Sequence, residues 1–231
     1  MAPDVAGSIP VSHPKVSFPV IIFQPRMDSK QHWEKIHSTK PADGVSWYRP
    51  HLDLSLSLIE QVAPSRSASI VDVGGGQSSL AGDLLARGYE NLTVLDISQT
   101  AIERAMERLG KSSSKVHWMD ADVLEAAIEQ NSCDIWHDRA VFHFLTDAGD
   151  RRAYARKMME SLKAGGHAVI STFALDGPDR CSGLNVVRYD TESLDKEFGP
   201  QLKRMQTGND LHRTPTGIPQ NFVYAVYRAE K

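Results

Sequence analysis

Short apolar runs alternate with amphipathic stretches along most of the chain. Runs rich in β-branched residues predict buried parallel strands, because such strands are covered on both faces. These runs, some of them given with the turn that follows the strand, are residues 70–73, 91–98, 116–123, 133–145 and 167–173. The segments between them have helical spacing, which favours an α/β fold with a doubly wound sheet. Leu202–Thr207 and Phe222–Tyr227 predict a final antiparallel hairpin.

Three stretches outside the strands define the remaining organisation. Leu52–Leu58 alternates like a strand, but Ile59, Val62 and Ala63 continue at helical spacing, and we predict a helix. A second helix is predicted over Asp150–Lys163, ended by Gly165 and Gly166. Residues 1–30 contain five prolines and predict an extended arm that packs at least Ile21–Phe23 on a single domain of residues 31–231.

A glycine-rich turn follows the first strand and contains the most informative residues. Asp72-Val73-Gly74-Gly75-Gly76 leads into a helix that Ser78 or Ser79 can cap, with its free N–H groups facing a ligand. Asp96 ends the next strand about 20 residues after the glycines, where a ribose diol is held in such folds. This pair of features predicts an adenosine ligand.

The choice among adenosine ligands depends on residues around the turn. The third glycine of a dinucleotide motif is replaced by serine, and the chain has no Gly-Lys-Ser/Thr for a triphosphate. Asp72 suits a cationic amino group better than a pyrophosphate. These residues favour S-adenosylmethionine and disfavour a nicotinamide oxidoreductase.

Three motifs in order resemble the class I S-adenosylmethionine-dependent methyltransferases. They are Val-Asp-Val-Gly-Gly-Gly, Val-Leu-Asp-Ile-Ser and Trp-Met-Asp-Ala-Asp-Val, and the resemblance spans residues 31–231. One departure is Ser78 at the family's commonest third glycine. The resemblance implies a seven-stranded, mostly parallel sheet of order 3-2-1-4-5-7-6, with helices on both faces.

The same resemblance implies a set of cofactor residues. Asp122 matches the acid that accepts from the adenine amine better than Asp120 does, although either acid can instead cap a helix over Val123–Glu129. Trp33 and Trp47 resemble the family's N-terminal cover. The predicted cofactor residues are Trp47, Asp72, Gly74, Gly75, Gly76, Ser78, Asp96, Ile97, Asp122, Val123 and His137.

Polar residues at the end of the fourth strand are the candidates for chemistry. His137 or His143 can remove a proton from the acceptor, with Asp138 orienting the imidazole. The alternative is that His137 only lies against the cofactor and His143 only packs. The residue spacing does not indicate a metal site. The Asn/Asp-Pro-Pro-Tyr/Phe pattern of DNA-base methyltransferases is absent from the sequence.

Arginines in the second half of the chain suit an acceptor that bears a carboxylate or another anion. The predicted substrate contacts are Tyr48, Arg49, Arg139, Arg180, Arg188, Tyr189 and His212. We therefore expect methyl transfer to N, O or S of a small molecule. A protein lysine is the alternative acceptor, and a noncatalytic cofactor-binding scaffold is the alternative class.

Composition restricts partners and location. The formal net charge is -3 and the pI is about 6.3, so nonspecific binding to nucleic acid is not expected. Cys133 and Cys181 predict reduced thiols in an intracellular, cytoplasmic protein. A mitochondrial presequence is disfavoured because the first arginine is Arg26. No apolar run approaches the length of a membrane span.

Overall fold

The computed structural model describes residues 27–231, with side chains from Ser29 onward. Helix α1 (Met27–Thr39) therefore begins four residues before the predicted domain boundary at residue 31. The predicted packing of Ile21–Phe23 lies outside the described residues.

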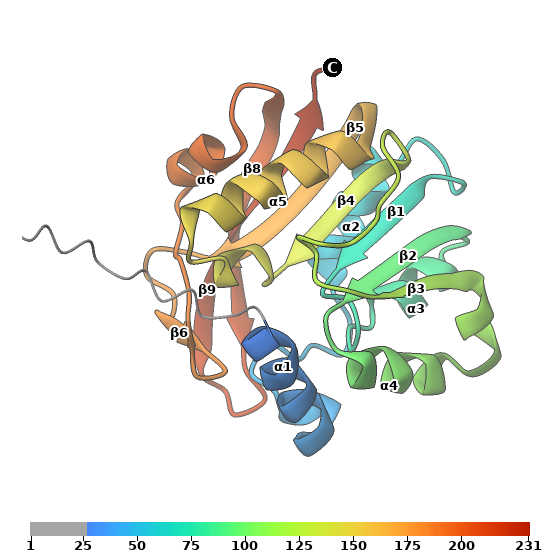
Figure 1. Cartoon of the computed structure of the whole chain (residues 1–231), viewed down its shortest axis with the longest axis vertical. Helices are drawn as coiled ribbons and strands as arrows, with labels where there is room; N and C mark the ends of the chain where they lie inside the picture. The colour runs from blue at the N-terminus through green and yellow to red at the C-terminus, as the bar shows by residue number, and fades with distance from the viewer. Residues whose placement is uncertain (1–26) are drawn as a thin grey trace, which may run out of the picture.

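Seven strands form one sheet in the order β3-β2-β1-β4-β5-β9-β8 (Figure 1). Neighbours from β3 to β5 pair in parallel, whereas β9 is antiparallel to β5 and to β8. Counted along the chain within this sheet, this is the predicted order 3-2-1-4-5-7-6. The strands are β1 Ser69–Val73, β2 Asn91–Asp96, β3 Val116–Asp120, β4 Cys133–Arg139, β5 Leu162–Phe173, β8 Leu202–Arg213 and β9 Pro219–Ala229.

Helices cover both faces of this sheet, with α5 crossing in front of it and α2 behind it in Figure 1. The remaining α-helices are α2 Asp53–Val62, α3 Leu80–Ala86, α4 Gln99–Leu109, α5 Ala148–Ser161 and α6 Thr191–Phe198. Short 3₁₀ turns are η1 Ala42–Gly44, η2 Gly110–Lys115 and η3 Phe142–Phe144.

Each sheet face buries its own apolar cluster. One contains Trp136 of β4 and Tyr154 of α5, and the other contains Ile59 of α2 and Val94 of β2. The sheet is therefore buried on both sides, which accounts for its runs of Val, Ile and Leu.

The helix predicted from Leu52 is confirmed as α2, because Leu56 and Ile59 share its buried face. The predicted end of α5 is wrong. The helix stops at Ser161, and Gly165 and Gly166 lie inside β5, where they do not end a helix. No helix forms over 123–129 either. A small hairpin of β6 (Arg180–Cys181) and β7 (Leu184–Asn185) was not predicted.

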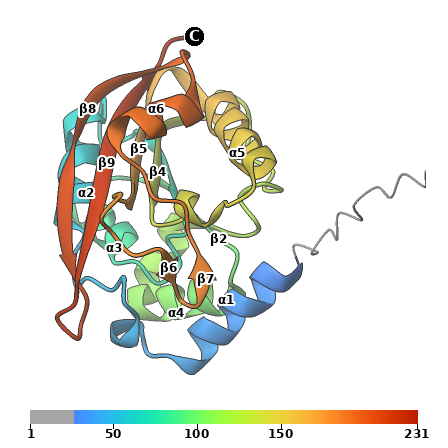
Figure 2. The same ribbon diagram turned by 90° about the vertical axis from the view of Figure 1, so that its left-hand side faces the viewer.

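The carboxyl ends of β1, β2 and β4 meet at one edge, and α1 and the β6–β7 hairpin lie at that same end of the molecule (Figure 2). The Glu34 carboxylate of α1 accepts hydrogen bonds from Gln99 N and Thr100 N at the start of α4. Lys30 pairs with Asp120 of β3 at 2.6 Å. These contacts hold α1 across the strand ends. Among the described residues, no helix is long and apolar enough to cross a membrane.

Candidate functional site

The glycine turn packs directly onto two carboxylates. Gly74 has φ +68°, a conformation that favours glycine, and its N–H donates to Leu95 O at 2.7 Å. A Cβ added at Gly75 would lie 2.2 Å from Asp72 Oδ2, and one added at Gly76 would lie 2.7 Å from Asp96 Oδ2. Side chains at these positions would displace the acids, so the turn requires glycine.

Asp96 is held by the backbone on both oxygens. Oδ2 accepts from Gly76 N and Oδ1 from Ser98 N, each at 2.9 Å. Burial raises the pKa of Asp96 from 3.8 to about 6, although these two hydrogen bonds oppose the shift. Because each carboxylate oxygen has two lone pairs, Asp96 can still accept from a ligand's hydroxyl groups.

Asp72 is held by a chain of buried side chains. Its Oδ1 lies 2.7 Å from His137 Nδ1, and His137 Nε2 lies 2.9 Å from Ser55 Oγ. A carboxylate only accepts, so Nδ1 donates to Asp72, and Nε2 forms a hydrogen bond with the Ser55 hydroxyl. Asp72 Oδ2 is buried without a hydrogen-bond partner in the described structure. Buried carboxylate oxygens rarely lack a donor, so this atom fits a cationic ligand group.

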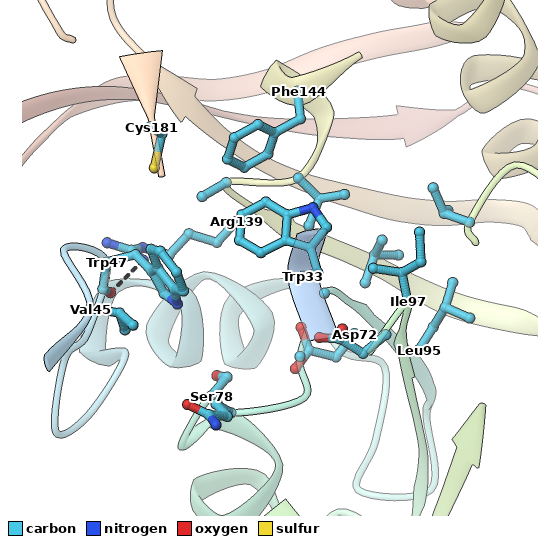
Figure 3. A pocket seen from close by; sticks show the side chains of 18 of the residues that line it. Trp33, Val45, Trp47, Asp72, Ser78, Leu95, Ile97, Arg139, Phe144 and Cys181 are labelled. Atoms are coloured by element: carbon cyan, nitrogen blue, oxygen red, sulfur yellow. Dashed lines mark hydrogen bonds between the residues drawn. The ribbon is translucent and has the colours of Figure 1, made fainter. Parts of the chain in front are cut away.

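One pocket of about 220 Å³ joins the glycine turn to the space beneath α1. Figure 3 shows Trp33 between Phe144 and Asp72, with Arg139 alongside Trp47. The predicted residues that line this pocket are Trp47, Tyr48, Arg49, Asp72, Gly74, Gly75, Ser78, Asp96, Ile97, Asp122, Val123, His137 and Arg139. The residues expected to hold the cofactor thus lie, with the exception of Gly76, on a single surface.

One end of the pocket is built from the end of β2 and the turn after β3. Leu95, Ile97 and Val123 supply apolar wall. Asp122 Oδ1 accepts from Leu124 N at 2.8 Å, which fixes the carboxylate at the turn. Asp120 lies outside the pocket, where it pairs with Lys30.

The opposite end is lined with aromatic rings. The ring centroids of Trp33 and Trp47 are 5.7 Å apart, and those of Trp33 and Phe144 are 5.0 Å apart. Arg139 Cζ lies 4.8 Å from the centre of the Phe222 ring. This compartment can exclude water from a reacting group.

Asp138 does not line the pocket. It is fully buried and accepts hydrogen bonds from Val141 N at 2.9 Å and from the Tyr154 hydroxyl at 2.6 Å. Tyr154 in turn accepts from Trp136 Nε1. These hydrogen bonds hold the turn after β4. They occupy the carboxylate of Asp138, which the sequence predicts to orient an imidazole.

His143 is also placed behind the pocket wall. Its ring stacks on Phe173 at 4.5 Å, and its Nδ1 accepts from Phe173 N. Burial lowers its pKa to about 3, so it is neutral and a weak base. Of the three predicted catalytic residues, only His137 lines the pocket, and both of its nitrogens are already hydrogen-bonded.

Four predicted substrate residues also lie outside the pocket lining. Arg180 donates to Gly183 O and Arg188 to Gly177 O. Tyr189 is buried against Phe142. His212 accepts from Arg49 Nε and donates to Ser46 O, so it supports the segment that carries Trp47.

Sequence analysis missed several pocket residues. His37 follows Trp33 by one helical turn, and this spacing places both on one face of α1. Phe173 ends β5 at the same sheet edge, a position that could have indicated it. Gln77 follows the glycines directly. No sequence signal marked Cys181 or Phe222.

Several enclosed polar atoms in this pocket have no hydrogen-bond partner among the described residues. They are His37 Nδ1, Asp72 Oδ2, both amide atoms of Gln77, Ser79 Oγ and Arg139 Nη2. Such a cluster fits a polar ligand with hydroxyl, amino and carboxylate groups. The glycine cradle and the acids meet the same requirement, so the residues present fit S-adenosylmethionine.

The chain is similar in sequence to known methyltransferases. Residues 70–166 match the model of a methyltransferase domain. The chain is 24% identical over 149 residues to a zebrafish (Danio rerio) eEF1A lysine and N-terminal methyltransferase, covering 63% of this chain. It spans about a fifth (21%) of that relative's length.

Solved structures share the fold. The N-methyltransferase NodS from Bradyrhizobium japonicum WM9, in complex with S-adenosylhomocysteine, has a TM-score of 0.65 at 19% identity, covering 88% of this chain and 99% of that one. The 1,6-didemethyltoxoflavin-N1-methyltransferase from Burkholderia thailandensis has a TM-score of 0.64 at 16% identity, covering 89% and 85%. The architecture is that of the class I methyltransferases. The domain match over residues 70–166 and the shared fold support a class I S-adenosylmethionine-dependent methyltransferase, with S-adenosylmethionine as the cofactor.

Proposed function

We propose that this chain transfers a methyl group from S-adenosylmethionine to N, O or S of a small molecule. The observation that carries the proposal is the single pocket, which joins the cofactor residues to an aromatic compartment under α1. Trp33, Trp47 and Phe144 close this compartment. An acceptor of limited size fits such an enclosure.

The cofactor residues have distinct tasks in this proposal. When bound, S-adenosylmethionine supplies an electrophilic methyl group on a sulfonium. Asp72 Oδ2 accepts from the cofactor's amino group, Asp96 from the ribose hydroxyls and Asp122 from the adenine amine. The aromatic rings exclude water and hold the acceptor in line, and alignment with desolvation supplies most of the acceleration of such a displacement.

A protein lysine is the second candidate acceptor. It is favoured by the zebrafish relative, whose name gives eEF1A lysine as a substrate. Arg139 opposes it, because its guanidinium lines the acceptor end and repels a cationic side chain. The small-molecule acceptor is therefore preferred.

The test uses S-adenosylmethionine labelled on its methyl group. The chain is incubated with the dialysable and the retained fractions of a cell extract, with the Asp96→Ala variant as control. Label in the dialysable fraction is expected. Label in retained protein alone would support the lysine acceptor. No label in either fraction, from a chain that binds S-adenosylhomocysteine by calorimetry, would favour the noncatalytic cofactor-binding scaffold.

A further inference from the structure

Arg139 is a cation without a carboxylate partner in the described part of the chain. Its Nη1 donates to Trp47 O at 3.3 Å, and its enclosed Nη2 has no hydrogen-bond partner. The nearby acid Asp210 is occupied by Arg49 at 2.9 Å. Enclosed charges are costly unless paired, so the site lacks one anion.

The surroundings of Arg139 restrict what that anion can belong to. Phe222 covers one side of the guanidinium, and the ring centroids of Phe173 and Phe222 are 4.7 Å apart. Both rings, with Trp33 and Trp47, line the same pocket. Aromatic rings therefore form apolar walls around the N–H donors of the Arg139 guanidinium.

The guanidinium is charged at neutral pH. Burial, and then the positive charge of Arg49, lower the pKa of Arg139 to about 10, which is still well above 7. Two neighbouring arginines raise the local positive potential, and only Arg49 is neutralised by an acid.

We propose that Arg139 binds an oxyanion, such as a carboxylate, of an aromatic methyl acceptor whose ring lies among Trp33, Trp47 and Phe144. This inference rests on the proposed function and names the substrate class for its acceptor site. The guanidinium fork matches a carboxylate in a bidentate geometry. A neutral or cationic acceptor would leave the charge of this guanidinium unpaired.

The cofactor's own carboxylate is the competing partner for Arg139, because it is an oxyanion in the same pocket. S-adenosylhomocysteine carries that carboxylate, whereas 5′-methylthioadenosine lacks the whole amino-acid part. Comparing these two ligands separates a cofactor contact from an acceptor contact.

The experiment measures benzoate and benzamide binding to the chain loaded with S-adenosylhomocysteine, by calorimetry or ligand-observed NMR. Benzoate is expected to bind at least about tenfold more tightly than benzamide. Arg139→Met should remove this preference and Arg139→Lys should retain part of it. Arg188→Met, an arginine outside the pocket lining, is the matched control and should leave it unchanged.

Three outcomes would overturn the assignment. They are equal binding of the two probes by the unaltered chain, tighter binding of n-butylamine than of benzoate, and an Arg139→Met variant that loses S-adenosylhomocysteine but keeps 5′-methylthioadenosine. The last outcome would assign Arg139 to the cofactor. If the unaltered chain fails to bind S-adenosylhomocysteine, the proposed function itself fails, so the two failures are distinguishable.

Discussion

Tyr154→Phe tests the structural role of the buried network behind the pocket. The Tyr154 hydroxyl donates to Asp138 Oδ2 at 2.6 Å and accepts from Trp136 Nε1 at 2.9 Å. All three side chains are buried. Removing one oxygen therefore deprives a carboxylate of a donor and leaves an indole N–H without an acceptor.

The expected loss of stability follows from these two contacts. A hydrogen bond to a charged group contributes about 1.5–3 kcal/mol, and an orphaned buried donor costs about 1–3 kcal/mol. Together they predict a decrease of about 4 kcal/mol in the free energy of unfolding. For a chain of this length, that lowers Tm by roughly 8–16 °C.

The pH dependence gives the prediction a second readout. Burial raises the pKa of Asp138 from 3.8 to about 6, so the stability that this group contributes below pH 3.8 is lost as the pH rises through about 6. Because the Tyr154 hydrogen bond lowers this pKa, the variant raises it further. The stability deficit of the variant should be largest above about pH 6 and should shrink at lower pH.

The assay is urea unfolding at several pH values, followed by far-ultraviolet circular dichroism. Tyr224→Phe is the matched control, because the Tyr224 hydroxyl accepts from Gln206 Nε2 at 3.4 Å, which is near the limit of a hydrogen bond. This variant should lose less than about 0.5 kcal/mol of stability. A Tyr154→Phe variant as stable as this control would refute the role assigned to the network.

Two further predictions concern the cofactor end. Ser55→Ala removes the hydroxyl that holds His137 and, through His137, Asp72. The Kd for S-adenosylhomocysteine should therefore rise about 2- to 12-fold, whereas the Kd for 5′-methylthioadenosine should not change. If calorimetry shows equal losses of affinity for both ligands, Ser55 has a purely structural role. Because Asp96 titrates at about 6, S-adenosylhomocysteine should bind more weakly as the pH falls from about 7.5 to about 5.5. Asp96→Asn should flatten this profile, and a flat profile in the unaltered chain would contradict it.

The fold could be predicted well because the sequence patterns that specify it lie within single elements or follow one another in a fixed order along the chain. The apolar runs and the glycine turn specify the parallel strands, and the terminal hairpin follows from its own pattern. The end of α5 could not be predicted from Gly165 and Gly166, because these glycines lie in strand β5. There a Cβ on Gly166 would approach Asp134 O to 3.1 Å and Cys133 O to 3.3 Å, which is closer than an ordinary contact. That constraint depends on a neighbouring strand.

The candidate site divides in the same way. Asp72 and Asp96 could be placed because strand ends define them. His137 and Asp138 are adjacent in sequence, but alternation along β4 sends one toward Asp72 and the other toward Tyr154. Which of the two neighbours faces a ligand depends on the helices that pack on each face of the sheet, α2 with Ser55 and α5 with Tyr154, and the local sequence of β4 does not specify it. The lack of a carboxylate partner for Arg139 among the described residues likewise becomes visible only in the three-dimensional structure.

The most direct test of the account is calorimetric binding of S-adenosylhomocysteine to the unaltered chain and to Asp96→Ala. The account predicts micromolar binding, on the order of 8 kcal/mol, by the unaltered chain and a loss of at least about tenfold in the variant, because its ribose acceptor is gone. Absence of binding by the folded, unaltered chain, or equal affinity in the variant, would contradict the cofactor site described for this methyltransferase.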